Sequence, residues 1–358
     1  MKARVSVTIP VYNEIRFIHK TLESVIGDAD EIILSDNAST DGTSDICQTF
    51  ANKYPEIKYT RHKENMGAVF NGRFVLDQAS GKYIRVMGAH DMLSIGSNQS
   101  MASLLDNNPD VVMVYSKYVI GLNADYSTRY FHEFNEFRED LLSDHAAIRT
   151  KSMITNLREF SIVFGLWRKD IFIHCISPRI FQSLTTDHTM LSSTAARGKL
   201  MADDKSIFFR MNPRDVDTNI VEQNERYLKG MFPSSPLSNN RSFWFFALIA
   251  EQYDMLIEVF GENSEISKDL LDFLILKFLC VFGESELTMD GMPPIISGKE
   301  NFCQNLMTTL QKYRDNKCNY REKKKEKNNM LTKRMKKTIK YILPYGFYKL
   351  LQHIKAIR

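Results

Sequence analysis

Apolar runs and amphipathic segments alternate through the first third of the chain. Between the runs, apolar residues recur at helical spacing, as Ile18, Leu22 and Val25 do. Alternating strand and helix patterns of this kind predict an α/β fold, with a mostly parallel sheet that helices cover on both faces. The runs that we expect to form strands are residues 5–9, 31–34, 57–59, 82–87 and 111–115.

The pattern changes twice further along the chain. Residues 120–215 are less regular and rich in aromatic and polar residues, which suits a region that closes over the sheet. Helical patterns return at residues 243–260 and 270–282. The second of these contains Asp272 and Lys277, so a buried helix is favoured over a membrane span.

Charge is concentrated at the end of the chain. From Arg321 onward, 13 Lys and Arg residues stand against two Glu residues, while the remainder of the chain is mildly acidic. Such a local concentration argues against a general nucleic-acid-binding protein. Leu331, Met335 and Ile339 recur at helical spacing among the cations, which predicts a basic amphipathic helix on an anionic membrane surface. The alternative is a helix that packs on the body or on another subunit.

The cysteines give no sign of a metal or redox motif. All five are far apart, which is typical of reduced thiols in a cytoplasmic protein. Residues 1–4 lead straight into the first expected strand, so we expect no signal peptide. The cysteines are Cys47, Cys175, Cys280, Cys303 and Cys318.

Two of the expected strands end in distinctive polar segments. The first reads PVYNE at residues 10–14, and the second reads SDNASTDGT at residues 35–43. Ligands of such sheets bind at the carboxyl ends of parallel strands. Both segments, in this order, resemble the signature of the family 2 glycosyltransferases, which implies the GT-A fold. The resemblance places the nucleotide-sugar donor against Pro10, Tyr12, Glu14 and Asp36, and less specifically against Asn65 and Gly67.

We expect different roles for Asp36 and Asp41. Asp36 follows a strand directly, where its carboxylate is able to accept a hydrogen bond from a base or a ribose hydroxyl. Its alternative role is that of a turn residue. Asp41 precedes Gly42 and is expected to cap the next helix.

A third polar segment, GAHD at residues 88–91, stands where the family carries its D-x-D element. In the family this element binds Mg²⁺ or Mn²⁺ and, through the metal, the diphosphate of the donor. Here Gly88 and His90 occupy positions of expected carboxylates, and Asp91 remains. Imidazole is able to bind transition metals, so the resemblance implies a site of Asp91 and His90 with metal dependence left open. Alternatively, His90 packs at a turn and Asp91 caps the following helix.

The resemblance also implies a general base and an acceptor-binding segment. Asp187 matches the base that takes the proton of the acceptor hydroxyl, although it is also a good helix cap, and His188 is a weaker alternative. Trp167 and Arg168 match the acceptor side, where an indole ring is able to stack on a sugar. The alternative for Trp167 is a place in the core.

These features together predict an inverting glycosyltransferase. The donor is expected to be a UDP-sugar and the acceptor a glycan or a lipid-linked intermediate of surface polysaccharide synthesis, with the enzyme on the inner face of the cell membrane. One alternative is a non-catalytic nucleotide-sugar-binding subunit with a degenerate metal site. Another is a nucleotidyltransferase, but its Gly-rich phosphate loop is missing after the first strand. The oligomeric state is left open.

Three regions are expected along the chain. The first is a glycosyltransferase domain at residues 1–215, in which residues 1–120 bind the donor and residues 120–215 bind the acceptor. A helical region at residues 216–320 follows, and residues 321–358 form a membrane-associating tail.

Overall fold

The computed structural model confirms the α/β class. Within the residues that it describes, helices flank one continuous sheet, and both the sheet and the helices contribute to a single core. The described residues are 4–121, 129–132, 138–156, 160–176, 186–211, 241–262 and 264–282.

The first half of the sheet is parallel, as the sequence predicts. Its elements are β1 (Val5–Val11), α1 (Ile18–Val25), β2 (Glu31–Asp36), α2 (Thr43–Lys53), β3 (Ile57–Arg61), α3 (Ala68–Gln78) and β4 (Tyr83–Val86). The strands lie in the order β3-β2-β1-β4, and each pair of neighbours is parallel. All six residues of β2 are buried, because helices cover both faces of the sheet. The carboxyl ends of β2, β1 and β4 therefore meet at one edge.

The second half of the sheet is mixed. Its strands are β5 (Met92–Leu93), β6 (Val111–Gly121), β7 (Arg129–His132), β8 (Leu166–Arg168) and β9 (Lys199–Met211). The pair β6–β9 is parallel, whereas β8 runs antiparallel to both β4 and β6. β5 joins the far edge through an antiparallel pairing with β9. This pairing brings the end of β9 next to the segment that follows β4.

The described parts of residues 120–215 are more regular than their sequence suggests. β9 continues through Asp203, Asp204 and Lys205, whose polarity interrupts the apolar run that would have predicted a strand. A register shift between β6 and β9 at Ser116 accompanies this interruption. The helices up to this point are α4 (Ser97–Asn107), α5 (Arg138–Leu141), α6 (Ala146–Asn156), η1 (Phe160–Phe164), α7 (Lys169–Cys175) and α8 (Thr186–Arg197).

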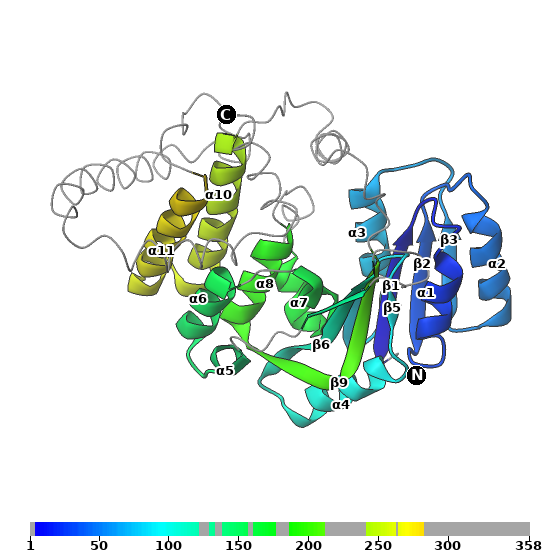
Figure 1. The fold of residues 1–358 in the computed structure, drawn as a ribbon, viewed down its shortest axis with the longest axis horizontal. Helices are drawn as coiled ribbons and strands as arrows, with labels where there is room; N and C mark the ends of the chain where they lie inside the picture. The colour runs from blue at the N-terminus through cyan, green and yellow to red at the C-terminus, as the bar shows by residue number, and fades with distance from the viewer. Residues whose placement is uncertain are drawn as a thin grey trace.

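Two long helices follow, and both were predicted. They are α10 (Arg241–Phe260) and α11 (Glu265–Phe282). They pack against each other, and α10 also packs against α8 and α11 against α6. Figure 1 shows this helical group on one side of the view and β1–β3 with α1–α3 on the other. The predicted tail at residues 321–358 lies outside the described residues.

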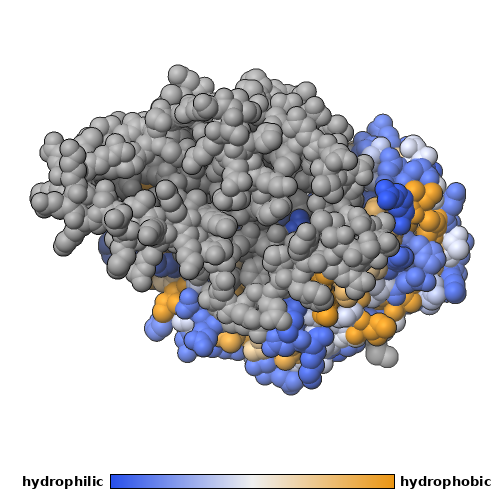
Figure 2. Space-filling view, viewed as in Figure 1, coloured by the Kyte–Doolittle hydropathy of each residue, from blue (hydrophilic) through white to orange (hydrophobic). Residues whose placement is uncertain are grey.

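Three further observations concern the surface and the interior of the described residues. Among the described residues, no helix combines the length and apolar character that crossing a membrane requires. Figure 2 shows hydrophobic residues interspersed with hydrophilic ones on the described surface of this face. Cys47 and Cys175 are buried free thiols, as expected for reduced cysteines.

Candidate active site

Three segments that follow parallel strands come together at one edge of the sheet. Residues 12–14 follow β1, residues 37–42 follow β2 and residues 88–91 follow β4. Hydrogen bonds join them in a continuous chain. Asp36 accepts from the backbone N–H of Ser39, and the Ser39 hydroxyl accepts from the N–H of Asn13. The next residue, Glu14, contacts His90. The sequence-predicted residues on these segments therefore lie close together at one edge of the sheet.

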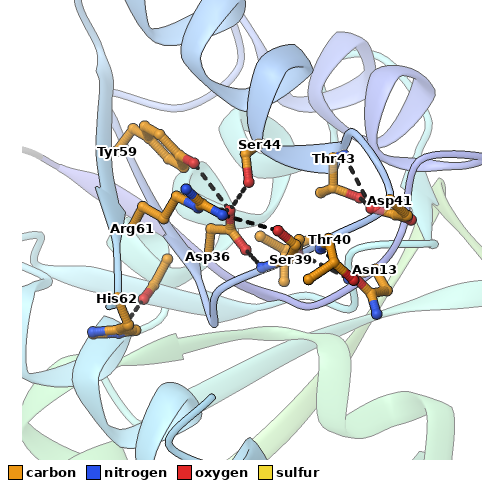
Figure 3. A network of polar contacts seen from close by, with 12 residues as sticks. Asn13, Asp36, Ser39, Thr40, Asp41, Thr43, Ser44, Tyr59, Arg61 and His62 are labelled. Carbon is orange, nitrogen blue, oxygen red and sulfur yellow. Dashed lines mark hydrogen bonds and ion pairs between the residues drawn. The ribbon is translucent and has the colours of Figure 1, made fainter. Parts of the chain in front are cut away.

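Asp36 is the anchor of the segment after β2 (Figure 3). Its side chain is fully buried, at 0% exposure. One oxygen accepts from Ser39 N at 2.8 Å, and the other accepts from the hydroxyls of Ser44 and Tyr59 and lies 3.4 Å from Arg61 Nε. Burial alone would raise the pKa of Asp36, but the hydrogen bonds from Ser39 and Ser44 outweigh it and lower the pKa. Asp36 is therefore an ionised carboxylate that organises its loop.

Two non-glycine residues at this edge have left-handed backbone conformations. The φ angle is 55° at Asn13 and 63° at Ala38. Such angles cost free energy for residues with a Cβ atom, and they cluster at functional sites. The Asn13 carboxamide oxygen accepts from Thr40 N at 2.8 Å, which holds the two segments together. Asp41 accepts from the N–H groups of Thr43 and Ile15, so it binds the first residue of α2, whose N-cap residue is Gly42 and not Asp41 as predicted.

The loop after β3 is tied to the loop after β2. The Asn65 carboxamide oxygen accepts from Asn37 Nδ2 at 2.8 Å and from Gly67 N at 2.9 Å. Gly67 has φ 88°, a conformation that glycine adopts without a steric cost. Buried Asn71 donates to the Ser35 carbonyl and accepts from the Ser35 hydroxyl. Asn65 and Gly67 therefore lie at the same edge as Asp36, where they were predicted.

Glu14 and His90 form a pair between the segments after β1 and β4. Glu14 Oε1 lies 2.9 Å from His90 Nδ1, and both side chains are partly exposed. Burial lowers the pKa of His90, but the bond to Glu14 and the charge of Asp91 outweigh it, so the pKa is raised above its ordinary value. Glu14 is held in turn by its backbone N–H, which donates to Thr43 Oγ1 at 2.8 Å. Pro10 lies next to Ser35 of β2 near the end of β1, and Tyr12 beyond it is exposed.

The side chain of Asp91 points into the interior of the protein. Its side chain has 1% exposure, and Oδ1 accepts from Met211 N at 2.9 Å. Burial raises the pKa of Asp91 to about 6, although the charges of His90 and Arg210 partly offset this. A Cβ atom at Gly88 would lie 2.6 Å from Asp91 Oδ2 and 3.4 Å from His90 Nε2. The missing side chain of Gly88 thus leaves a space that a carboxylate oxygen and an imidazole nitrogen flank.

A carboxylate oxygen and an imidazole nitrogen are a donor pair that fits a transition-metal ion. No group of three His, Cys, Asp or Glu side chains that could hold a metal occurs among the described residues.

Asp187 lies in the first turn of α8 and is exposed. Its carboxylate is accessible, which a general base requires. Its role stays a prediction, as does the weaker alternative His188 in the same turn.

Trp167 and Arg168 do not lie at the site, and their predicted acceptor role is wrong. β8 pairs antiparallel to β4, with Arg168 opposite Tyr83 at the amino end of that strand. Trp167 has 0% exposure, and its Nε1–H donates to the Val163 carbonyl at 3.1 Å. Arg168 donates to the carbonyls of Leu105, Asn108 and Val111. Their backbone direction and packing give them structural roles at the opposite edge.

Sequence reasoning missed the residues that hold the predicted ones. Ser44, Tyr59 and Arg61 surround Asp36, yet they lie in α2 and β3 and form no motif with it. Met211 fixes Asp91 from 120 positions away in the chain. Only tertiary structure brings these residues to the site.

Comparison with known proteins shows which family this region resembles. Residues 6–164 match the model of the glycosyl transferase family 2. Abequosyltransferase RfbV of Salmonella typhimurium is 31% identical over 115 residues, which are 30% of this chain and 34% of that protein. The putative teichuronic acid biosynthesis glycosyltransferase TuaG of Bacillus subtilis is 34% identical over 93 residues, 25% of this chain and 37% of that protein. The chain thus spans about a third of the length of these relatives.

A solved structure supports the fold. GalNAc-T7, determined with UDP, GalNAc and Mn²⁺, superposes with a TM-score of 0.50 and 14% identity, over 85% of this chain and 54% of that one. At this identity the likeness concerns the fold alone, and it agrees with the GT-A architecture. Residues 6–164 therefore resemble the glycosyl transferase family 2.

Proposed function

We propose that the protein is an inverting glycosyltransferase that uses a nucleotide-sugar donor, in particular a UDP-sugar. The observation that carries the proposal is the hydrogen-bonded chain from Asp36 through Ser39 and Asn13 to Glu14 and His90. It joins the ends of three strands at the edge where α/β sheets bind nucleotides. The match of residues 6–164 to family 2 supports the same activity.

In this proposal, the donor lies along the three strand ends. Asp36 positions the nucleotide part of the donor indirectly, through the loop that it organises. A direct contact between the donor and the Asp36 carboxylate requires Ser44 or Tyr59 to move. Tyr12 is exposed beside this loop and offers a ring face for the base, while Pro10 fixes the exit of β1. Asn65 and Gly67 border the same region.

The diphosphate lies against residues 88–91. His90 Nε2 and Asp91 Oδ2 are the atoms that would hold Mn²⁺ or Mg²⁺ there. A bound divalent cation supplies charge neutralisation to a departing nucleoside diphosphate. Arg210, whose charge acts on both residues, adds positive charge on the same side.

The transfer itself is a single displacement. The acceptor hydroxyl oxygen forms a bond to the anomeric carbon, the bond from that carbon to the diphosphate breaks, and the hydroxyl proton passes to Asp187. The exposure of Asp187 supports this role. Because attack and departure occur on opposite faces, the configuration at the anomeric carbon inverts.

The acceptor is proposed to be a glycan or a lipid-linked intermediate of a surface polysaccharide. The names of the two relatives, an abequosyltransferase and a teichuronic acid biosynthesis glycosyltransferase, support this class. The basic tail at residues 321–358 supports attachment to an anionic membrane on its cytoplasmic face.

A non-catalytic nucleotide-sugar-binding subunit is the second candidate. The observation that favours it is the inward orientation of Asp91, together with His90 in place of a family carboxylate. A catalyst and a binder differ in whether bound donor is consumed.

The test is release of nucleoside diphosphate from a panel of sugar donors by the full chain with acceptor lipid extract. Asp187→Asn is expected to lower turnover about 10²- to 10⁴-fold, the usual contribution of a general base, with donor binding unchanged. Asp170→Asn is the matched control, because Asp170 is also an exposed carboxylate in a first helical turn, that of α7. Donor binding without any turnover would support the binder, and an unaffected Asp187→Asn variant would remove Asp187 as the base.

A further inference from the structure

We infer that the fully buried guanidinium of Arg85 holds interior water molecules against the carboxylates of Asp28 and Asp203. These waters, together with a direct hydrogen bond from Arg85 to Asn98, fasten the segment at residues 87–96 to the protein interior. We call the four residues the Arg85 cluster. They lie on β4, in the turn after α1, on β9 and on α4, and none of them is proposed above to contact a donor, an acceptor or a metal.

Arg85 is a buried charged side chain that, among the described residues, no carboxylate contacts directly. It has 0% exposure, and its Nη1 donates to Asn98 Oδ1 at 3.0 Å and lies 3.6 Å from the Met101 sulfur. Nε and Nη2 have no hydrogen-bond partner in the described part of the chain. Burial lowers the pKa of Arg85 to about 10, so the guanidinium is still charged at neutral pH. A buried charge with two unused donor nitrogens requires acceptors.

Asn98 contributes a third unused donor. Its Oδ1 faces Arg85, because an arginine side chain only donates hydrogen bonds. The other end of the carboxamide, Nδ2, is buried and has no partner among the residues that the structure describes. Two neighbouring side chains with 0% exposure therefore present three donor nitrogens that the described protein atoms do not satisfy.

Two carboxylates near Arg85 have acceptor capacity left. Each oxygen of Asp28 accepts one hydrogen bond, from the backbone N–H groups at the start of α4. Each oxygen of Asp203 also accepts one, from Lys205 N and from the Ser206 hydroxyl. A carboxylate has about four sites for hydrogen-bond donors, so both retain free lone pairs. The charges of both carboxylates raise the pKa of Arg85, although burial outweighs them.

Water fits this arrangement better than an anion does. One guanidinium stands beside two carboxylates, so an anion would add a third negative charge to a buried place. A water molecule accepts a hydrogen bond from an N–H group and donates to a carboxylate at the same time. Buried waters typically make about three hydrogen bonds to polar groups that have no other partner. The unused donors and the free lone pairs of the Arg85 cluster meet this requirement.

The Arg85 cluster joins the elements that flank residues 87–96. Arg85 lies near the end of β4, before the segment, and Asn98 lies in the first turn of α4, after it. Asp203 lies on β9, which pairs with β5 inside the segment and whose last residue donates to Asp91. A hydrated cluster at this place therefore restricts the movement of the whole segment.

A crystal structure of the full chain, at a resolution that shows ordered water, tests the inference without any variant. We expect at least one water within about 2.7–3.2 Å of Arg85 Nε or Nη2 that also contacts Asp28 or Asp203. Crystals soaked in bromide are expected to show no anomalous signal at this place. A direct ion pair between Arg85 and either carboxylate, the lack of water at both nitrogens, or a bromide signal there would overturn the inference.

Arg85→Met and the matched control Arg149→Met separate local fastening from general stability. Arg149 is also a buried arginine, but its Nε and Nη1 donate directly to backbone carbonyls. Arg85→Met is expected to speed hydrogen–deuterium exchange at the amides of Leu93, Ser94 and Asn98 about 10- to 100-fold, the effect of losing a hydrogen bond to a charged group. Arg149→Met should leave these three amides as slow as in the wild type.

Thermal unfolding establishes that each variant is folded. Arg85→Gln, which is uncharged but polar, takes the place of Arg85→Met if the methionine variant does not fold. Wild-type exchange at the three amides in the folded variant, or equal acceleration in Arg149→Met, would contradict the fastening of residues 87–96 by the Arg85 cluster.

Discussion

The two ends of β2 carry carboxylates that differ in their surroundings. Glu31 at the amino end and Asp36 at the carboxyl end are both almost fully buried, and both accept several hydrogen bonds. The partners of Glu31 are Ser6 in β1, Lys58 in β3 and Ser80 before β4, so they join regular strands. The partners of Asp36 include Ser39 and Ser44, beside the left-handed residue Ala38.

A buried carboxylate is therefore not by itself evidence of a site. Burial and hydrogen bonding are alike at the two ends of one strand. The two carboxylates differ in the edge of the sheet at which they lie and in the backbone beside them. Of the segments at the two ends of β2, only those at the carboxyl edge contain non-glycine residues in the left-handed conformation. We therefore expect Glu31 to act on stability, and we propose ligand binding for the region of Asp36.

The largest effect is expected from Asp36→Asn. The new amide nitrogen would face the donors of Ser44, Tyr59 and Arg61, so the loop after β2 would lose its anchor. UDP affinity is expected to fall about 10- to 100-fold, which corresponds to one or two hydrogen bonds to a charged group. Calorimetric titration with UDP measures this loss. Unchanged affinity in a folded variant would contradict the assignment.

Glu31→Gln is expected to act on stability and not on binding. The variant loses the ion pair with Lys58 and weakens the contact with Ser80, which should lower the free energy of unfolding by about 1.5 kcal/mol. Denaturant titration measures this change, and the UDP affinity of the variant should equal that of the wild type. A loss of UDP affinity here would remove the distinction between the two edges.

The free energy of unfolding at acidic pH should further test the structural role of Glu31. Burial raises the pKa of Glu31, but hydrogen bonds from Lys58 and Ser6 outweigh it, so the pKa lies below its ordinary value of 4.5. The stabilisation is then complete above about pH 4.5 and is lost as the pH falls through the lower pKa of the folded state. The unfolding free energy of Glu31→Gln should accordingly fall less steeply below pH 4.5 than that of the wild type. Parallel curves would show that Glu31 does not titrate in this way.

The smallest effect is expected from Ala38→Gly. Glycine removes the steric cost of the left-handed conformation, about 1–2 kcal/mol. It also raises the conformational entropy of the unfolded chain, which destabilises the folded state by about 0.4–1 kcal/mol. The net result should be a stabilisation of about 1 kcal/mol or less. Ala51→Gly in α2 is the control and should destabilise by about 1 kcal/mol, because glycine is unfavourable within helices. Equal destabilisation of both variants would mean that Ala38 is not strained.

Local sequence patterns predicted the elements and the strand ends well. The segments containing Glu14, Asp36 and His90 were expected at one edge, since parallel neighbours end on the same side, and the hydrogen-bonded chain agrees. Trp167 and Arg168 were misassigned because the antiparallel direction of β8 follows from its pairing with β4 and not from its own sequence.

The side-chain directions in residues 88–91 could not be predicted either. Asp91 turns inward because Met211, distant in sequence, donates to it, and Gly88 provides the room. A local motif shows which residue types are present, while the direction of each side chain depends on neighbours that only the folded chain supplies.

Hydrogen–deuterium exchange of the full chain with and without UDP and Mn²⁺ tests the central claim most directly. We predict slower exchange in residues 12–14, 37–42 and 88–91 at the carboxyl edge, with no change in residues 28–31 and 80–83 at the amino edge. Protection confined to the amino edge, or bound UDP without protection of the three carboxyl-edge segments, would contradict it.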